Sequence, residues 1–520
     1  MASLAGEDDP FKDPSLAGSS TPQLESQMQD SAVDPTLAVG RNASLTLATD
    51  SLIVLGTSLL VRHEGLLEAR SSACCGLSLT PGQNKATRSI PFFNILWAEY
   101  SQDEEITIQY AHAEAKETVR PATIRYTLET KERDVVDAWM AALLHRAYGP
   151  SQRQKRIKVL VNPFGGQGKA QKIYNKHIAP ILAAARCEID VEMTTHNEHA
   201  IEIAKNIDVD KYDVIACCSG DGVPHEVFNG LGQKDDGAHA LAKIAVSQLP
   251  CGSGNALSLN MNGTNSPSLA AVAMVKGLRT PLDLVSITQR DKRTLSFLSQ
   301  SVGIVAETDL ATEHLRWMGS ARFTWGFFTR LVGKKIYPAD IAVKFEVETK
   351  ADIRAVYSAE KSKPPPNHEE RPMPAMGTGL PELKWGTVND PLPTEWDLVP
   401  HDRLGNFYAG NMAYMSPDAN FFPASLPSDG CVDLVRIDGD IDRWTAIKTL
   451  DAISKHQFFD QPHVDYHKIS AYRIIPKNQP DGYISIDGER VPFQPFQAEV
   501  HKGLGTVLSR SGHLYEARGP

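Results

Sequence analysis

Three glycine-rich turns, each directly after a short apolar run, constrain the fold of this chain more than any other feature. They read Gly-Gly-Gln-Gly at 165–168, Ser-Gly-Asp-Gly at 219–222 and Gly-Ser-Gly at 252–254. A helical pattern follows each turn. Strands that alternate with helices are typical of βαβ units, so we predict an α/β region with a parallel sheet over 153–288.

The hydrophobic pattern places the elements of this region approximately. We predict strands at 157–161, 187–193, 214–217 and 244–247. Helical stretches begin near Gly168, Glu198, Val223 and Asn255. Pro180 must kink or end the first of these helices, because its ring nitrogen carries no N–H for helical hydrogen bonding.

Glycines at the C-terminal end of a strand let the backbone approach a ligand, and the following helix adds a positive dipole end. Ligands of open parallel sheets bind at this edge, and phosphate suits such a site. Two common nucleotide motifs do not fit. A Walker loop would need Gly in place of Pro163 and Ser or Thr in place of Ala170, and the last Gly of the dinucleotide motif would fall on Gln171. A single glycine turn is commonly an ordinary loop, but three at one sheet edge favour phosphate binding.

Asp221 stands between the glycines of the second turn. A hydroxyl is a poor nucleophile toward phosphorus, and a positioned carboxylate that accepts its proton is a standard catalytic solution. Two other roles remain open: a Mg²⁺ ligand and a cap of the following helix. We expect His225, on that helix, to orient the loop.

The regions on either side of the glycine turns have different patterns. Residues 1–45 are rich in Ser, Pro, Asp, Gln and Ala and are expected to be a disordered tail. Residues 46–150 combine alternating strand patterns with one helix at 131–148, which carries Trp139. This layout resembles a pleckstrin-homology-like (PH-like) β domain with a closing helix.

The C-terminal half is again rich in strand patterns. We expect a β-rich part over 289–512, with one helix at 441–457, and a short tail over 513–520. The proline-dense segment 361–398 has no core-forming pattern and is expected to be a flexible insertion.

Composition excludes some classes of function. Lys and Arg number 53 and Asp and Glu 63, so the net charge is −10, which argues against nucleic acid as a partner. The apolar run at 52–61 is interrupted by Gly, Thr and Ser and is too short to span a bilayer. The N-terminus shows no secretory signal, and seven cysteines fit reduced intracellular thiols. Cys74 and Cys75 are either buried thiols or palmitoylation sites. We expect a cytoplasmic protein.

The three glycine turns and the residues around them resemble the motifs of a known family. Gly-Gly-Gln-Gly-Lys-Ala, Ser-Gly-Asp-Gly-Val-Pro-His-Glu-Val-Phe-Asn-Gly-Leu and Leu-Pro-Cys-Gly-Ser-Gly-Asn-Ala-Leu resemble the diacylglycerol-kinase catalytic domain. Within that superfamily they are most similar to sphingosine (long-chain base) kinases. The match covers about 155–290 and recurs in patches to about 510. It implies an ATP-dependent lipid kinase whose nucleotide lies between an α/β subdomain and a C-terminal β-sandwich.

The resemblance also implies roles for individual residues. Asp221 would be the catalytic base. The substrate would be bound by Ser219, Gly220, Asp221, Gly222 and Asp309. The nucleotide would be bound by Asn162, Pro163, Phe164, Gly165, Gly166, Gly168, Thr194, Glu226, Gly252, Ser253, Gly254, Arg316, Arg322, Asp487, Gly488 and Glu489. No residue is assigned as a direct metal ligand, and Mg²⁺ would arrive with ATP.

Several of these residues have plainer alternatives. Thr194 can cap a helix, Asp309 and Arg316 can form a solvated ion-paired helix face, and Asp487-Gly488 is a strong hairpin signal. The aromatic run at 323–328 can be core, or it can line an acyl-chain pocket or enter a bilayer, with the lysines at 334–335 meeting anionic headgroups.

The predicted activity is phosphorylation of the terminal hydroxyl of a sphingoid base to its 1-phosphate. Asp309 suits the ammonium group that such a base has and diacylglycerol lacks. The alternatives are a ceramide or diacylglycerol kinase and, from another class, a non-catalytic lipid or nucleotide sensor. Because the substrate is a lipid, we expect peripheral association with a membrane surface, and the oligomeric state is left open.

Overall fold

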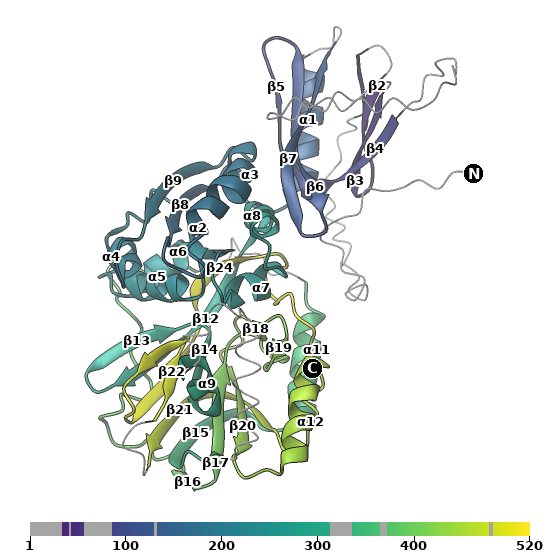
Figure 1. Ribbon diagram of the computed structural model, residues 1–520. Helices are drawn as coiled ribbons and strands as arrows, with labels where there is room; N and C mark the ends of the chain where they lie inside the picture. Colours follow the sequence, from purple (N-terminus) through teal and green to yellow (C-terminus); the bar gives the residue numbers. More distant parts are fainter. Residues whose placement is uncertain are drawn as a thin grey trace. The chain divides into compact units, whose positions relative to one another are not determined.

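A computed structural model describes residues 34–40, 43–56, 86–128, 133–311, 335–364, 372–477 and 482–520 (Figure 1). It divides the chain into two compact units. One contains Met1–Gln154 and Asn175–Glu188, and the other contains Lys155–Tyr174 and Ile189–Pro520. Most of the expected disordered tail lies outside the described residues.

The described part of the first unit up to Gln154 contains two antiparallel sheets and the helix α1, and its second segment contains α3 (Ala179–Ala184). One sheet contains β1 (Thr36–Val39), β2 (Ala43–Leu47), β3 (Ser51–Gly56) and β4 (Ala86–Pro91). The other contains β5 (Ile95–Tyr100), β6 (Glu105–Ala115) and β7 (Thr118–Thr127), and helix α1 spans Arg133–Tyr148. Trp139 of α1 is buried, and its indole N–H donates to the carbonyl of Pro35 at 3.2 Å. The helix therefore closes onto the start of the first strand.

The expected start of this domain at residue 46 is wrong, because β1 and most of β2 precede it. Leu37 and Val39 alternate with exposed residues and are buried. Four residues between Pro35 and Gly40 are too short a run to stand out from the polar composition around them.

The helix after the first glycine turn changes type before Pro180. Helix α2 (Ala170–Ile173) leads into a π-helical turn (Tyr174–Ile178) and then into α3 (Ala179–Ala184). A proline in the first turn of α3 needs no N–H partner there, and the π turn accommodates the interrupted bonding. The predicted irregularity at Pro180 is confirmed. In the first unit, Arg186 pairs with Glu99 of β5 at 2.5 Å.

The second unit begins with the predicted parallel strands. They are β8 (Arg156–Val161), β9 (Glu188–Met193), β10 (Val214–Ser219) and β11 (Ala245–Pro250), and β10 pairs in parallel with both β8 and β11. The helices are α4 (His199–Asn206), α5 (Gly222–Gly232), α6 (Gly237–Lys243), α7 (Ala256–Asn262) and α8 (Pro267–Lys276). The sequence reading missed α8 because nearly all of its residues are buried, which leaves no amphipathic period.

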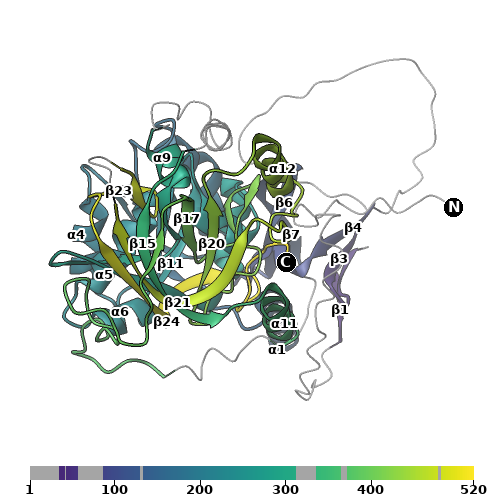
Figure 2. The same cartoon turned by 90° about the horizontal axis from the view of Figure 1, so that it is seen from below.

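Antiparallel strands form most of the remainder of this unit. The strands are β12 (Leu278–Gln289), β13 (Lys292–Ser296), β14 (Ser299–Gly303), β15 (Ala339–Val347), β16 (Val399–His401), β17 (Leu404–Gly410), β18 (Tyr414–Ser416), β19 (Ala419–Asn420), β20 (Val432–Asp438), β21 (Asp465–Pro476), β22 (Ile484–Ile486), β23 (Glu489–Val491) and β24 (Phe496–Ser509). Figure 2 shows several of them from below, including β15, β17, β20 and β21. The helices are α9 (Ile304–Ala311), α11 (Lys350–Lys361) and α12 (Arg443–Ser454).

The long strand β24 joins the parallel and antiparallel strands. It pairs antiparallel with β12 and β21, and in parallel with β11 through Val246 and Val507. Within the described residues, one branched sheet of 15 strands results. The expected β-sandwich is therefore not a separate pair of hydrogen-bonded sheets, because its strands share one network with the parallel strands.

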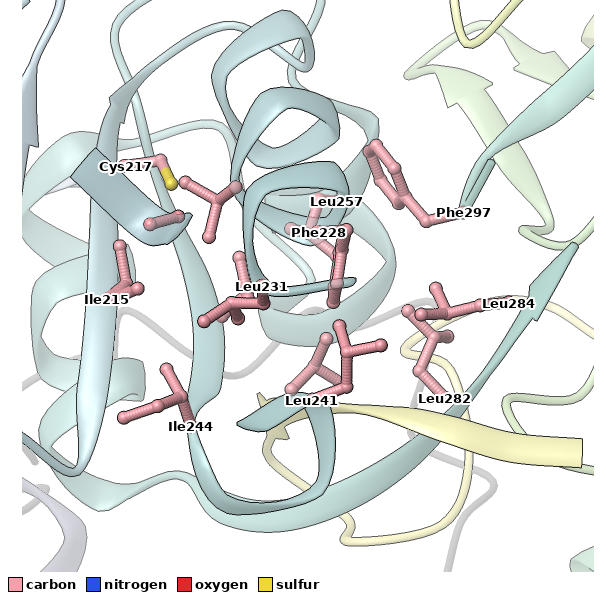
Figure 3. Packing of buried hydrophobic residues seen from close by; sticks show 14 of the residues in the cluster. Ile215, Cys217, Phe228, Leu231, Leu241, Ile244, Leu257, Leu282, Leu284 and Phe297 are labelled. Carbon is pink, nitrogen blue, oxygen red and sulfur yellow. The ribbon is translucent and has the colours of Figure 1, made fainter. Parts of the chain in front are cut away.

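A large apolar core supports the glycine turns (Figure 3). It packs Ile215 and Cys217 of β10 and Phe228 and Leu231 of α5 against Leu282, Leu284 and Phe297. Burial of each large apolar side chain contributes about 1.5–3 kcal/mol. The core also brings α5 close to α4, since a Cβ on Gly230 would lie 2.5 Å from the carbonyl oxygen of Ile201. Helix α5, which follows Asp221 directly, is thereby fixed.

The expected flexible insertion at 361–398 is wrong for its second half. Residues 372–398, which we call the strap, have few regular elements, yet Trp396 is buried and packs against Ala342 and Ala471. Both carboxylate oxygens of Glu499 accept backbone N–H groups of the strap, from Lys384 and Trp385, at 2.9 Å. Residues 365–371 lie outside the described residues.

The expected tail at 513–520 is also docked. Tyr515 is buried, and the N–H of Glu516 donates to the carbonyl of Asn260 at 2.7 Å. Among the helices described, none has both the length and the apolar character required to cross a lipid bilayer.

Candidate active site

A cavity of about 460 Å³ lies in the second unit at the C-terminal ends of β8, β10 and β11. This is the edge at which parallel sheets bind ligands. Much of the polar lining comes from the three glycine turns, the start of α5 and the β22–β23 hairpin, and further polar residues include Ser299 and Ser301 of β14 and Asp418 between β18 and β19. The apolar part comes from Val305, Tyr408, Met415, Phe421 and Ile453. One cavity therefore joins a phosphate-type wall to a hydrophobic wall.

The glycine turns pack against one another through their backbones. A Cβ on Gly252 would lie 2.3 Å from the Cα of Gly220, and one on Gly166 would lie 2.9 Å from the carbonyl oxygen of Cys251. The N–H of Asp221 donates to the carbonyl of Gly254 at 3.2 Å. These glycines are thus required first for the turns to approach each other, and through that contact they shape the ligand wall.

In the first turn, the side-chain oxygen of Asn162 accepts the backbone N–H groups of Phe164 and Gly165 at 2.9 and 3.1 Å. Asn162, Phe164, Gly165 and Gly166 all line the cavity. The predicted contacts Pro163 and Gly168 are not among the lining residues. The role of Gly168 is conformational, since its φ is +69°.

The Asp221 carboxylate lies in the cavity wall and is held by three donors. Its Oδ1 accepts from Gln248 Nε2 and the N–H of Leu257, both at 3.1 Å, and its Oδ2 accepts from the N–H of Ala256 at 2.9 Å. Asp221 therefore caps α7, not the helix that directly follows it. Burial raises the pKa of Asp221 above its usual range, although these hydrogen bonds reduce the rise.

Glu226 makes a structural contact that no local motif indicates, and Thr194 lies outside the cavity lining. Glu226 lines the cavity, but its Oε2 accepts the N–H of Ala200 at 3.0 Å at the start of α4. Burial raises the pKa of Glu226. Thr194 is buried at the end of β9 and is not a lining residue, so its predicted nucleotide contact is not supported. Asn197 lines the cavity instead.

Asp487 lies at the tip of the β22–β23 hairpin, with φ of +51° at Asp487 and +88° at Gly488. Positive φ at both central residues is the hairpin geometry that Asp-Gly predicts. Asp487 is among the residues that line the cavity, but its carboxylate, expected to bind nucleotide, is fully buried and is held by donors from the protein. Its partners are Ser296 Oγ, the N–H groups of Phe297, Leu298 and Ser299, and His225 Nδ1.

His225 therefore pairs with Asp487, and no hydrogen bond links its side chain to the Asp221 loop among the described contacts. Burial lowers the pKa of His225, but the hydrogen bond to Asp487 and the charge of that carboxylate outweigh it, so the net pKa is raised. Burial raises the pKa of Asp487, and the hydrogen bond and charge of His225 reverse this to a lowered value. Both shifts have the same cause, the 2.8 Å contact between the His225 ring and the Asp487 carboxylate.

Gly488 and Glu489 follow Asp487 and line the cavity. Glu489 is exposed, and its Oε1 is 3.6 Å from the position of a Cβ on Gly222, at the start of α5. Within the described residues no hydrogen bond or ion pair of Glu489 is recorded. Its carboxylate is thus available to a ligand on the wall opposite the second glycine turn.

Of the remaining predicted site residues, some line the cavity and the side chains of the others lie outside the described residues. Ser219, Gly220, Gly222, Ser253 and Gly254 line the cavity, as does Gly252. Asp309 is on α9, next to the lining residue Thr308, and its side chain lies outside the described residues. Arg316, Arg322, the aromatic run at 323–328 and Cys74–Cys75 also lie outside them.

The sequence reading missed the hydrophobic wall. Val305 is on α9, Tyr408 on β17, Met415 on β18, Phe421 after β19 and Ile453 on α12. No local motif marks these residues, because each is an ordinary apolar position of its own element. Among the described lining residues there are five carboxyl side chains and no Lys or Arg, and the described residues contain no cluster of three or more His, Cys, Asp or Glu that could hold a metal.

Comparison with known proteins identifies the family. The chain is 34% identical over 424 residues to sphingoid long chain base kinase 4 of Schizosaccharomyces pombe (strain 972 / ATCC 24843), covering 81% of this chain and 88% of that protein. It belongs to the sphingoid long-chain base kinase family. It is 36% identical over 438 residues to sphingoid long chain base kinase 5 of Saccharomyces cerevisiae (strain ATCC 204508 / S288c), covering 74% of this chain. The alignment spans 63% of that relative's length.

Further matches agree with this assignment. Sphingosine kinase 1 of Homo sapiens is 29% identical over 373 residues, covering 69% of this chain and 92% of that protein. The family model "Diacylglycerol kinase catalytic domain" matches residues 156–287, and a domain of unknown function (DUF7493) matches 35–149. The solved structure of a putative diacylglycerol kinase from Bacillus anthracis str. Sterne covers 69% of this chain and 97% of its own, at 17% identity and a TM-score of 0.49, which is too low to support a conclusion about fold. The resemblance to long-chain base kinases is confirmed.

Proposed function

We propose that this protein transfers the γ-phosphoryl group of ATP to the terminal hydroxyl of a sphingoid long-chain base. The observation that carries the proposal is the composite cavity, in which Asp221 stands beside three glycine turns and the same space continues along apolar side chains. A sphingoid base has a polar amino-alcohol end and a long hydrocarbon chain. Such a molecule suits a cavity that has both kinds of wall.

Asp221 is the proposed general base. Its carboxylate is fixed by Gln248 and by the start of α7, so the oxygen that receives the hydroxyl proton is held in place before substrate binds. A pKa raised by burial makes the carboxylate a stronger base than an exposed aspartate. Proton removal and alignment of the hydroxyl with the γ-phosphate are the two contributions of this residue.

The charge of the cavity bears on the cofactor. A nucleotide triphosphate is strongly negative, and the described lining offers carboxylates and backbone N–H groups without a Lys or Arg side chain. A Mg²⁺ ion bound with ATP fits this lining, because carboxylate oxygens are its preferred protein ligands and Glu489 is available. Bound there, the ion would neutralise phosphate charge. Arg316 and Arg322 are the proposed cationic contacts.

Substrate choice is proposed to depend on Asp309 of α9. A carboxylate favours the ammonium group of a sphingoid base, whereas ceramide carries an amide and diacylglycerol carries no nitrogen. The test is competition of sphingosine, ceramide and diacylglycerol in one reaction with labelled ATP and Mg²⁺. Transfer to sphingosine above the other two supports the proposal. Preferred transfer to ceramide or diacylglycerol overturns the substrate assignment, and ATP binding without transfer to any lipid overturns the enzymatic one.

We also propose a domain type for the first unit and a cellular location for the protein. Two antiparallel sheets closed by α1 support a PH-like domain, and the lipid nature of the substrate supports peripheral membrane association of a cytoplasmic enzyme. The proposed role of this domain is membrane targeting or autoinhibition. Comparison of the full chain with a chain lacking 1–150 in liposome sedimentation and activity assays tests it. Unchanged binding together with unchanged activity would exclude both roles.

A further inference from the structure

The buried carboxylate of Asp487 connects three walls of the cavity. We propose that Asp487 and His225 form a positioning bridge that holds Asp221 and Glu489 on opposite sides of one ligand, and that Asp487 itself does not contact the nucleotide. The proposal rests on the proposed kinase activity and adds to it two positioning residues.

The first argument is that Asp487 has no capacity left for a ligand. Oδ1 accepts from Ser296 Oγ at 2.5 Å and from the N–H groups of Leu298 and Ser299 at 2.9 Å. Oδ2 accepts from the N–H of Phe297 at 2.9 Å and from His225 Nδ1 at 2.8 Å. Two carboxylate oxygens offer about four acceptor positions, and five donors already occupy them. A phosphate or a metal ion would have to displace protein donors.

The second argument concerns what the bridge holds. Leu298 and Ser299 donate to Asp487 and also line the cavity, so the same contact fixes the β13–β14 turn. Gly488 and Glu489 follow Asp487 directly and line the cavity from the hairpin. The carboxylate therefore fixes two neighbouring walls of the antiparallel sheet relative to each other.

The third wall is helix α5, reached through His225. The backbone N–H of His225 donates to the carbonyl of Asp221 at 3.2 Å, so His225 lies one helical turn after the proposed base. One further turn along the same face, Asn229 exchanges two hydrogen bonds of 2.8 Å with the backbone of Leu295. Two successive turns of α5 are thus attached to the strand and turn that Asp487 also binds.

These contacts make the bridge a link between the base and Glu489. Asp221 precedes α5, Glu489 follows Asp487, and the hydrogen bond between His225 and Asp487 joins their two elements. An ion pair is not needed for stability as such, since apolar side chains fill buried space as well or better. An ion pair instead has one preferred geometry, which an apolar contact lacks.

The test compares His225→Leu, Asp487→Asn, the double variant and His225→Asn in the full-length chain. In His225→Asn the side-chain amide N–H replaces Nδ1 as donor. We expect the Leu and Asp487→Asn variants to lose kcat by about a hundredfold, as expected for a displaced catalytic group. The KM for ATP should change by less than about threefold in both variants. The double variant should lose no more kcat than either single variant, because both substitutions break the same contact. His225→Asn should recover most of the wild-type kcat.

A control uses His239 of α6, whose Nδ1 donates to the carbonyl of Pro374 at 3.0 Å and which does not line the cavity. His239→Leu should retain wild-type kcat. A raised KM for ATP in Asp487→Asn, with unchanged kinetics in His225→Leu, would show that Asp487 is a nucleotide ligand and overturn the bridge. Equal losses in His225→Asn and His225→Leu, or a lower melting temperature with wild-type kcat in the folded protein, would also overturn it.

A second measurement separates this inference from the proposed function. Hydrogen–deuterium exchange at the backbone N–H groups of 297–299 and at Gly488 and Glu489 needs no substrate. The bridge predicts faster exchange at these positions in His225→Leu and near-normal exchange in His225→Asn. If the wild-type chain transfers phosphate to no lipid, the proposed function fails, and the exchange result alone decides whether the bridge holds these walls.

Discussion

Replacement of Asp221 by Asn tests the proposed base and its structural contacts together. In the wild-type chain, Oδ1 accepts two hydrogen bonds and Oδ2 accepts one, the latter from the N–H of Ala256. An Asn side chain can keep its oxygen at the Oδ1 position, where Gln248 and Leu257 donate. Its NH₂ group then faces the Ala256 N–H, so two donors oppose each other at the start of α7.

The expected loss of stability follows from the one hydrogen-bond acceptor that the Ala256 N–H loses. A buried N–H left without a partner costs about 1–3 kcal/mol. The entropy of unfolding is about 2 cal/mol/K per residue, so for a chain of this size such a loss lowers the melting temperature by about 1–4 °C. The effect on catalysis should be larger, because an amide cannot accept the hydroxyl proton and general-base catalysis contributes about 10²–10⁴-fold.

The assay measures transfer of labelled γ-phosphate to sphingosine from pH 4 to 9, alongside thermal melts. The base works only when ionised, so the wild-type rate should fall as the pH drops through the pKa of Asp221, which burial raises above the ordinary carboxyl range. Asp221→Asn should show a uniformly low rate without this acidic limb.

A matched control is Ser266→Ala, which removes the hydroxyl cap of α8, where Ser266 Oγ accepts the N–H of Leu269. It should lower stability by about 0.5–2 kcal/mol and leave the rate per folded molecule unchanged. Turnover of Asp221→Asn within about tenfold of wild type would refute the assigned role, since a general base contributes more.

Three further predictions follow from packing and charge. Gly252→Ala would place a Cβ 2.3 Å from a backbone Cα atom of the second glycine turn, so we expect transfer activity to fall by about a hundredfold. As a control, a Cβ on Gly379 would have no atom within 4 Å, so Gly379→Ala should match wild type in thermal melts and activity. Lys468→Met would leave its two aspartate partners without a buried cation and should destabilise the chain by about 3–5 kcal/mol in denaturant titrations. Glu499→Gln should speed proteolysis within the strap, detected by mass spectrometry, at unchanged kcat, because the strap does not line the cavity.

The sequence was most informative where structure depends on neighbours in the chain. Three of the parallel strands of 156–250 are short apolar runs and β9 alternates apolar and acidic residues; each ends at a glycine or a polar turn, so its position could be predicted within about three residues. The Asp487-Gly488 hairpin could also be predicted from local sequence, since only these two residues determine its backbone geometry. The glycine turns predicted both the sheet edge and the cavity found there.

Long-range contacts could not be predicted in the same way. Asp487 receives its donors from residues 188–262 positions away along the chain, so no local spacing could show that its carboxylate is directed inward. The strap was read as flexible because its prolines break every period, yet Glu499 binds it through backbone N–H groups, which any sequence provides. Helix α8 lacks an amphipathic pattern because it is buried on all sides.

The five carboxyl groups in the cavity wall divide into two kinds by their partners. Asp221, Glu226 and Asp487 each accept backbone N–H groups, so each holds an element as well as facing or flanking the cavity. Glu489 and Asp418 are exposed and have no recorded partner within the described residues. Loss of a carboxylate of the first kind should therefore reduce stability and activity together, since the element it holds also moves. Loss of one of the second kind should reduce activity at nearly constant stability, because only water or ligand loses a partner. Under the proposed function, the carboxylates without a hydrogen-bond partner in the described part of the chain, Glu489 and Asp418, would be the ones suited to a cation that accompanies ATP, and Asp487, although adjacent to Glu489, would not be among them.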